Sequence, residues 1–232
     1  MPPTTDIMVA LDVNTLEEAD ALVQAIGPAI TWYKVGKQLF TRHGPETVAR
    51  LKRAGKKVFL DLKFHDIPNT AAQAVRSAAA IGADLTNVHA AGGPAMLQAA
   101  AEAGRATGIQ VIAVTVLTSL DATQLAATGV PTPPADQVRL LARLAFAAGI
   151  GGVVCSAHEI QAMRREFGPG FLLVVPGIRP AGAEHGDQKR VMTPREAATA
   201  GADFLVIGRP ITAAADPAAA AAAIRQELAA AQ

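Results

Sequence analysis

The chain has 232 residues and half of them are hydrophobic, so it can bury one large core of the size found in a single α/β domain. A net charge of +1, no basic run, one Trp and one Tyr argue against a nucleic-acid surface built on charge and stacking. A single cysteine excludes an internal disulfide, and no apolar stretch reaches membrane-spanning length. We therefore expect a cytoplasmic protein with no membrane or nucleic-acid partner.

Predicted strands and helices alternate along the whole chain. Apolar residues recur every second position in the strands and with helical spacing in the helices. The expected strands, in chain order, are residues 7–13, 31–35, a run that begins at 57, 84–89, 110–117, 152–155, 171–175 and 204–207. The expected helices are residues 16–26, 45–54, 69–81, 93–107, 121–127, a segment that ends at 148, 157–167, 193–200 and a last one that begins at Asp216-Pro217.

Strict alternation of strand and helix requires a parallel sheet. Eight such units of this size predict an α/β fold, a single (β/α)₈ TIM barrel over residues 1–232. The structural alternative is a doubly wound open sheet. That fold would need a G-x-G-x-x-G or G-x-x-x-x-G-K-[ST] phosphate motif early in the chain, and the sequence has neither.

The segment 57–70 carries charges where a buried strand should have none. Side chains two apart share a face of a strand, so Asp61 and Lys63 point the same way at its end. Asp66 follows just beyond the point where the strand can continue. An ordinary ion pair is the alternative, but a buried pair is often no more stabilising than apolar packing. This D-x-K-x-x-D cluster therefore favours a catalytic role.

Polar residues also fall at the ends of other predicted strands, where a barrel has its working face. These residues are Asp12 on the first strand, Lys34 on the second, Asp61 and Lys63 on the third, and Thr118 with Ser119 after the fifth. A lone charge at a strand end is most often solvated. Because several independent strands deliver such residues to the same rim, the sequence predicts one site there.

The loops after the last two strands predict a phosphate site, because barrels often bind phosphate there together with a helix N-terminus. The loop after strand seven contains Arg179, Gln188, Lys189 and Arg190, and strand eight leads directly into Gly208-Arg209-Pro210. Gly208 lets the backbone approach a ligand, and Arg209 offers a forked donor to phosphate oxygens. The alternative for Arg209 is a solvated loop arginine.

The sequence does not favour a metal site. The five histidines are scattered and no pair has a ligand spacing such as H-x-x-x-H. We expect His65 to have a structural or supporting role, and Cys155 to be inert packing in an apolar strand.

The run Asp61-Leu-Lys63-Phe-His-Asp66-Ile-Pro-Asn-Thr70 resembles the signature of the orotidine 5′-phosphate decarboxylase family in its bacterial form. Further matches follow in the family's order: Leu11-Asp12, Tyr33-Lys34-Val-Gly36, Thr115-Val-Leu-Thr118-Ser, Pro176-Gly-Ile-Arg179, Gly186-Asp-Gln188-Lys-Arg190 and Val206-Ile-Gly208-Arg209. The resemblance implies conversion of orotidine 5′-phosphate to uridine 5′-phosphate and CO₂ in de novo pyrimidine biosynthesis. It also implies that no cofactor takes part.

The same resemblance implies roles for individual residues. Lys34, Asp61, Lys63 and Asp66 would form a charged tetrad in which Lys63 donates the proton to C6. Asp12 and Lys34 would contact the ribose, and Asp61 would lie near the departing carboxylate. Thr118 or the adjacent Ser119 would contact the pyrimidine. The phosphate would be held by Arg179, Gln188, Gly208 and Arg209. The family works as a homodimer in which Asp66 and Thr70 reach into the neighbour's site. The alternative for Thr70 is a purely structural helix cap, because Thr70-Ala-Ala-Gln73 fits a capping box.

Other functions also fit parts of the pattern. Barrels that resemble 3-keto-L-gulonate 6-phosphate decarboxylase or hexulose-6-phosphate synthase use D-x-K-x-x-D with a magnesium-bound enediolate, but the Ile67-Pro-Asn-Thr70 continuation argues against them. An aldolase would use Lys63 or Lys34 as a Schiff-base nucleophile. A catalytically silent nucleotide-binding barrel is the alternative from a different class.

Overall fold

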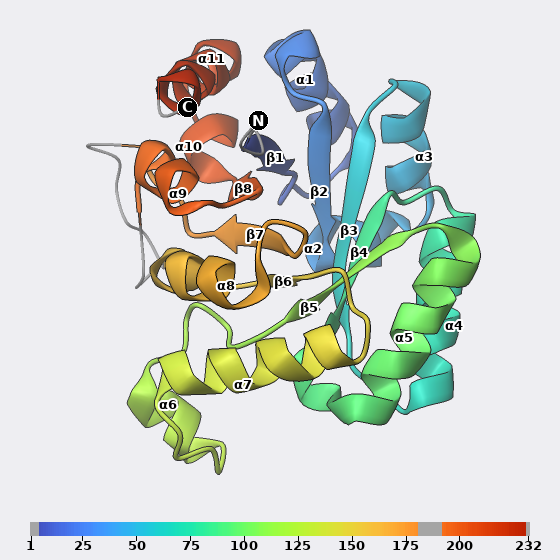
Figure 1. Ribbon diagram of the computed structural model, residues 1–232. Coiled ribbons are helices and arrows are strands. Elements are labelled where there is room, and N and C mark those ends of the chain that lie inside the picture. The colour runs from blue at the N-terminus through green and yellow to red at the C-terminus, as the bar shows by residue number, and fades with distance from the viewer. Residues whose placement is uncertain (1–4, 181–191, 231–232) are drawn as a thin grey trace.

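The computed structural model describes residues 5–180 and 192–230, and eight parallel strands close into a barrel at its centre (Figure 1). The strands are β1 (Asp6–Ala10), β2 (Trp32–Gly36), β3 (Lys57–Phe64), β4 (Leu85–His89), β5 (Gln110–Val114), β6 (Gly152–Val154), β7 (Leu172–Pro176) and β8 (Phe204–Ile207). Strand order follows the chain, and β8 pairs with β1 to close the ring. The predicted (β/α)₈ TIM barrel is therefore confirmed.

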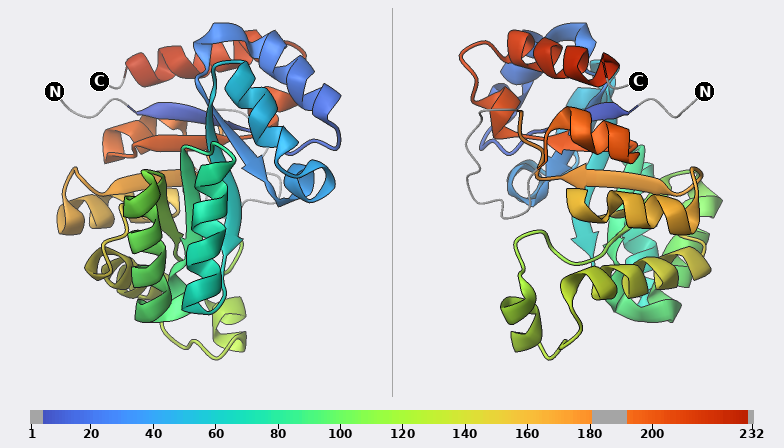
Figure 2. Two further views of the ribbon diagram at one scale, coloured as in Figure 1. Left: turned by 90° about the vertical axis from the view of Figure 1, so that its right-hand side faces the viewer. Right: turned by 60° about the vertical axis from the view of Figure 1, so that its left-hand side comes forward.

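Helices surround the barrel on all sides in Figures 1 and 2. They are α1 (Leu16–Ile26), α2 (Lys37–His43), α3 (Glu46–Arg53), α4 (Pro68–Ala80), α5 (Gly93–Thr107), α6 (Ala122–Ala127), α7 (Pro134–Ala147), α8 (Ile160–Phe167), α9 (Pro194–Ala200), α10 (Arg209–Thr212) and α11 (Pro217–Ala229), with short 3₁₀ turns at Gly27–Ala29, Ala90–Gly92 and Ala157–Glu159. In the part of the chain that the structure describes, no helix is long and apolar enough to cross a membrane.

Some elements differ from the sequence-based expectation. Helix α2 was not predicted, because it buries only Leu39 and so leaves no apolar periodicity to read. The fifth strand ends at Val114 rather than at Leu117. Val116 and Leu117 continue the apolar run because they line a cavity beyond the strand, which periodicity alone does not distinguish from strand packing.

The first turn of α4 corrects one interpretation. The helix begins at Pro68 with Ile67 as its N-cap, so Thr70 lies inside the first turn. Pro68 suits this start because its fixed φ is already helical and its missing N–H would have no partner there. The capping-box interpretation of Thr70 is therefore wrong, and its exposed side chain is left for another role.

The barrel interior explains how the fold prepares a site. Side chains from six strands fill the middle of the barrel in one apolar cluster, formed by Met8, Trp32, Phe59, Leu85, Ile112 and Val174. Inward-facing residues recur at every second position. The next inward positions toward the C-terminal ends therefore carry Lys34 on β2, Asp61 on β3 and Asn87 on β4. The apolar cluster therefore lies one layer below these polar groups inside the barrel.

Candidate active site

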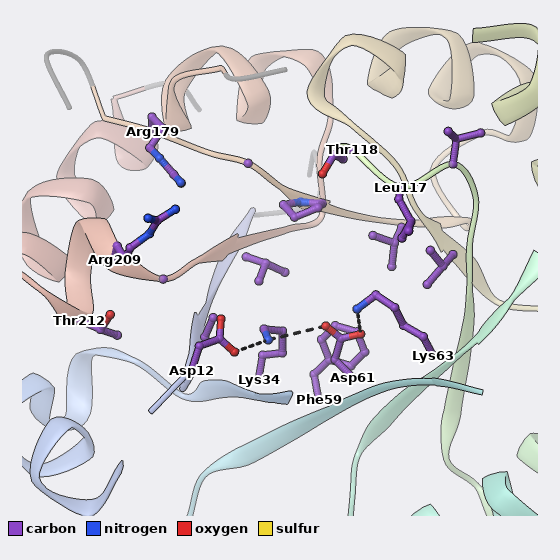
Figure 3. Close-up of a pocket in the computed structure, with 18 residues that line it drawn as sticks. Asp12, Lys34, Phe59, Asp61, Lys63, Leu117, Thr118, Arg179, Arg209 and Thr212 are labelled. Carbon is purple, nitrogen blue, oxygen red and sulfur yellow. Dashed lines mark hydrogen bonds and ion pairs between the residues drawn. The ribbon is translucent and has the colours of Figure 1, made fainter. Parts of the chain in front are cut away.

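A cavity of about 420 Å³ opens at the C-terminal ends of the strands (Figure 3). This volume lies in the range of small-molecule binding sites. Its polar lining consists of Asp12, Lys34, Asp61, Lys63, Thr118, Arg179, Arg209 and Thr212. The structure therefore gathers at one mouth most of the residues that the sequence assigned to a site.

Four side chains form a chain of alternating charge across the cavity floor. Lys34 Nζ lies 3.0 Å from Asp12 Oδ1 and 3.6 Å from Asp61 Oδ2. On the other side of Asp61, Lys63 Nζ lies 2.5 Å from Oδ1 (Figure 3). The Lys34 and Asp61 side chains are almost fully buried, whereas 25% of the Lys63 side chain is exposed. Of the two lysine side chains, that of Lys63 is therefore the more accessible to a ligand.

The surroundings of Asp61 keep its carboxylate charged. Burial is the largest single effect and by itself would raise the pKa of Asp61. The neighbouring charges of Lys34 and Lys63, with hydrogen bonds from Lys63 and Asn87, outweigh burial and hold that pKa below its ordinary value. Asp61 therefore carries a fixed negative charge beside the cavity at neutral pH.

Gly36 makes room for the Lys34–Asp12 pair. A Cβ atom at this position would lie 2.9 Å from Lys34 Nζ and 3.0 Å from Asp12 Oδ1, too close for either contact. Space is the reason for glycine here, because the Gly36 backbone is extended and any residue could adopt it. The sequence placed Gly36 in a motif with Lys34 but indicated no role for it.

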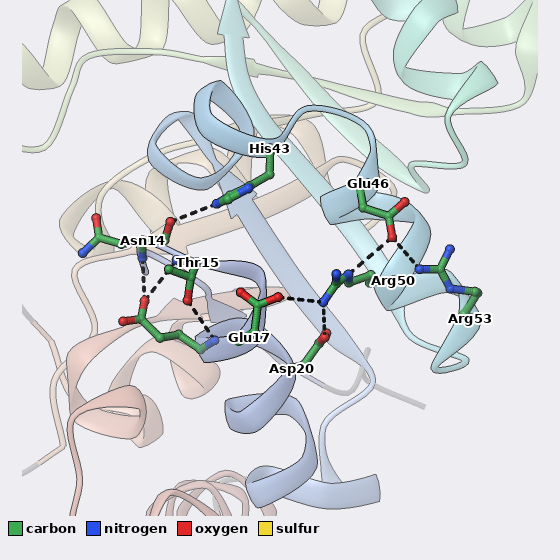
Figure 4. A network of polar contacts seen from close by, with 9 residues as sticks. Asn14, Thr15, Glu17, Asp20, His43, Glu46, Arg50 and Arg53 are labelled. Atoms are coloured by element: carbon green, nitrogen blue, oxygen red, sulfur yellow. Dashed lines mark hydrogen bonds and ion pairs between the residues drawn. The ribbon is translucent and has the colours of Figure 1, made fainter.

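A polar network on the outer side of the barrel holds the loop that carries Asp12 (Figure 4). His43 Nε2, on α2, lies 3.0 Å from the carbonyl oxygen of Asn14, two residues after Asp12. Arg50 on α3 contacts three carboxylates at 2.7–3.5 Å, those of Glu17, Asp20 and Glu46. The ion pairs of Arg50 with Glu17 and Asp20 join α3 to α1 and, being exposed, contribute about 0–1 kcal/mol each. The contact that reaches the loop itself is that of His43 with Asn14.

Two arginines stand at the rim, apart from the lysines and aspartates of the floor (Figure 3). Arg179 follows β7, and Arg209 begins α10 directly after Gly208. All three residues line the cavity, as does Thr212, which the sequence analysis did not predict. Thr212 lies three positions after Arg209 on α10, a spacing that places both on one face of a helix. Gln188, Lys189 and Arg190 lie outside the described residues.

Thr118 and Ser119 were adjacent candidates for contact with a base. Thr118 lines the cavity and is half-buried, whereas Ser119 is exposed and is not part of the lining. Of these two residues, Thr118 is therefore the one placed to contact a ligand in the cavity.

Asp66 and Thr70 do not reach the cavity of their own chain. Both are exposed, and Asp66 Oδ1 accepts a hydrogen bond from the Ile67 N–H at 2.6 Å. Ile67 between them is 67% exposed, unusual for a large apolar side chain. A single chain thus assembles Lys34, Asp61 and Lys63 with Asp12, but without Asp66.

His65 and His89 lie beside the site with ring centroids 5.4 Å apart. Burial, followed by the charges of His65 and Lys63, lowers the pKa of His89 to about 4. His89 is therefore neutral near pH 7. Cys155 is buried in the outer core, and no group of three or more potential metal ligands occurs within residues 5–180 and 192–230.

The fold and the site together define a class of protein: a (β/α)₈-barrel enzyme with paired lysines and aspartates at the bottom of its mouth and two arginines at the rim. The model of the family described as "Orotidine 5'-phosphate decarboxylase / HUMPS family" matches residues 5–224. The chain belongs to this family, and the resemblance seen in the sequence is confirmed.

Individual relatives are similar along their whole length. A protein of Anaeromyxobacter sp. (strain K), named orotidine 5′-phosphate decarboxylase, is 56% identical over 224 residues, which cover 97% of this chain and 98% of the relative. One of Halorhodospira halophila with the same name is 55% identical over 233 residues, covering 100% and 99%. The crystal structure of orotidine 5′-phosphate decarboxylase from Lactobacillus acidophilus has a TM-score of 0.87 at 37% identity, covering 97% of this chain and 99% of that one.

Proposed function

We propose that this chain is an orotidine 5′-phosphate decarboxylase, a carboxy-lyase that forms uridine 5′-phosphate and CO₂ in pyrimidine biosynthesis. The family match over residues 5–224 and relatives above 50% identity support this function. The observation that carries it in the structure is the Lys63 ammonium, 2.5 Å from a buried Asp61 carboxylate at the cavity floor.

The chemistry explains why such a pair is needed. When the bond from C6 of the uracil ring to the carboxylate breaks, its electron pair stays on C6 in an sp² orbital that the ring π-system cannot delocalise. Fixed positive charge must then stabilise the carbanion, and we propose that Lys63 supplies it and then transfers a proton from Nζ to C6. Asp61, held ionised by its surroundings, repels the substrate carboxylate until CO₂ has left.

The remaining polar groups of the cavity suit the rest of the nucleotide. We assign the ribose hydroxyls to Asp12 and Lys34, and the pyrimidine to Thr118. The phosphate is assigned to Arg179, Gly208 and Arg209, with Gln188 from outside the described residues. Binding energy from the phosphate, far from C6, can then contribute to the decarboxylation step. These charges act without a cofactor in our proposal.

A chelator separates this reaction from its magnesium-dependent relatives. We expect the loss of orotate absorbance with orotidine 5′-phosphate to proceed at the same rate in excess EDTA, because the charges that stabilise the carbanion are side chains. The matched assay with 3-keto-L-gulonate 6-phosphate plus Mg²⁺ should show no turnover. Loss of decarboxylation in EDTA with recovery on adding Mg²⁺ would contradict the proposal.

We also propose a homodimer in which Asp66 and Thr70 complete the site of the neighbouring subunit. The exposed position of both residues, on either side of the exposed Ile67, supports this arrangement. Asp66 would bring the lysine–aspartate tetrad to zero net charge, so that each ion is compensated before substrate arrives.

Mixing two inactive variants tests the shared site. Lys63→Ala and Asp66→Ala homodimers should each be inactive, but a hybrid dimer has one site with the native Lys63 and the native Asp66. After subunit exchange at equal amounts, half of the dimers are hybrids with one native site each, so about a quarter of wild-type activity should return. Activity that stays at the sum of the two parents would show that Asp66 serves its own chain.

We further propose that residues 1–232 act as one decarboxylase domain and that the enzyme works in the cytoplasm. The family match over most of the chain supports the first point, and a single, buried cysteine fits a reducing compartment.

A further inference from the structure

Asn87 is a fully buried polar residue on β4, next to Asp61 and Lys63 at the bottom of the site. Its side-chain amide is hydrogen-bonded at both ends. Nδ2 donates to Asp61 Oδ1 at 2.7 Å, and Oδ1 accepts from the backbone N–H of Lys63 at 2.8 Å. The carboxylate can only accept and the N–H can only donate, so only one orientation of the amide satisfies both partners.

The local structure of β3 explains why an amide is needed there. Leu60 pairs with Thr86 and Phe64 pairs with Val88, so three residues of β3 stand opposite the single residue Asn87. This bulge takes the Lys63 N–H out of the regular ladder. The side chain of Asn87 provides the acceptor that the backbone of β4 cannot.

The bulge also places Lys63 in an unusual backbone conformation. Its φ is +54°, and no other non-glycine residue within 5–180 and 192–230 has a positive φ. A left-handed conformation is unfavourable for a residue with a side chain, and it persists only where surrounding contacts hold it. The hydrogen bond from the Lys63 N–H to Asn87 is such a contact.

We infer that Asn87 is a positioning residue for decarboxylation: one amide group fixes the Asp61 carboxylate and the Lys63 backbone relative to each other. The inference rests on the proposed roles of Asp61 and Lys63. Asn87 does not line the cavity, so it acts through these two residues and not on the substrate. The alternative is a buried amide that contributes only to the stability of the fold.

Asn87→Leu tests the inference, because leucine has a similar size but neither hydrogen-bonding group. We expect kcat to fall about 10- to 100-fold while KM changes by less than about threefold, since ribose and phosphate contacts remain. Thr86→Val is the matched control. It removes another buried hydrogen bond on β4, that from Thr86 Oγ1 to the Leu60 carbonyl oxygen (3.0 Å), on the face that points away from the charged site.

The melting temperatures of the two variants are measured first, so that kcat is compared at a temperature at which both are folded.

A pH profile adds a measurement that a purely structural role of Asn87 would not change. Asn87 helps Lys34 and Lys63, the charged groups that face Asp61, to keep the pKa of Asp61 low. Without the amide, Asp61 takes up its proton at higher pH, so the acidic limb of the kcat profile should move upward in Asn87→Leu but not in Thr86→Val.

If Asn87→Leu does not fold, Asn87→Ser answers the same question, because its short side chain leaves space for water and reaches neither partner in the same way. A several-fold loss of kcat with unchanged KM supports the inference. The inference is overturned if the Asn87 variant that folds keeps kcat as high as Thr86→Val does. It is also overturned if only KM rises while kcat stays unchanged. A loss of kcat in Lys63→Ala that is far smaller than about 10⁴-fold would instead contradict the proposed role of Lys63, so the two failures are distinguishable.

Discussion

Lys63→Ala is expected to lower kcat by about 10⁴-fold or more, the combined effect of losing a proton donor and a fixed charge beside C6. The variant should still bind uridine 5′-phosphate, because the product has no carboxylate at C6 and its ribose and phosphate contacts lie elsewhere in the cavity. Single-turnover assays measure the loss of turnover, and titration calorimetry measures product binding.

Lys57→Ala is the matched control for this prediction. Lys57 begins the same strand, β3, at the opposite mouth of the barrel, and its exposed side chain lies over the Trp32 ring with Nζ 5.4 Å from the ring centroid. Its removal should leave kcat unchanged. The proposed role of Lys63 fails if Lys63→Ala keeps kcat close to that of the wild type. It also fails if product binding falls by the same factor as kcat, which would indicate a collapsed site.

Arg209→Ala is expected to raise KM for orotidine 5′-phosphate by about 10- to 100-fold, the usual cost of losing a charge-assisted hydrogen bond to phosphate. A smaller loss of kcat should accompany it, because remote binding energy contributes to the reaction at C6. Steady-state kinetics with the full nucleotide measure both effects.

The nucleoside orotidine, which lacks the phosphate, makes this prediction specific. Wild type and Arg209→Ala should have the same low kcat/KM toward orotidine, since Arg209 then has no group to bind. Arg225→Ala is the control, because Arg225 lies on α11 near the opposite end of the barrel, where it donates to the Ala29 carbonyl oxygen at 2.7 Å. An unchanged KM for the nucleotide in Arg209→Ala would contradict a phosphate role.

Much of the fold could be predicted from local patterns. Apolar periodicity and turn residues repeat eight times in alternation, which predicts a parallel sheet, and eight units without an early phosphate motif favour a closed barrel over an open sheet. The strand period of two also predicted Asp61 and Lys63 on one face. The structure joins them in an ion pair, but through a bulge in β3 rather than through regular alternation. Boundaries were less predictable: the fifth strand ends early because its last apolar residues line the cavity instead of pairing.

The sequence by itself determined the barrel order and the strand-end charges, because both follow from spacing along one chain. Only the tertiary structure decided which residues meet across strands. It set Asn87 opposite the bulge at Lys63, left Gly36 no space for a side chain and kept Asp66 out of its own cavity. Such contacts depend on register and on the close approach of separate segments, and neither is encoded in the periodicity of a single segment.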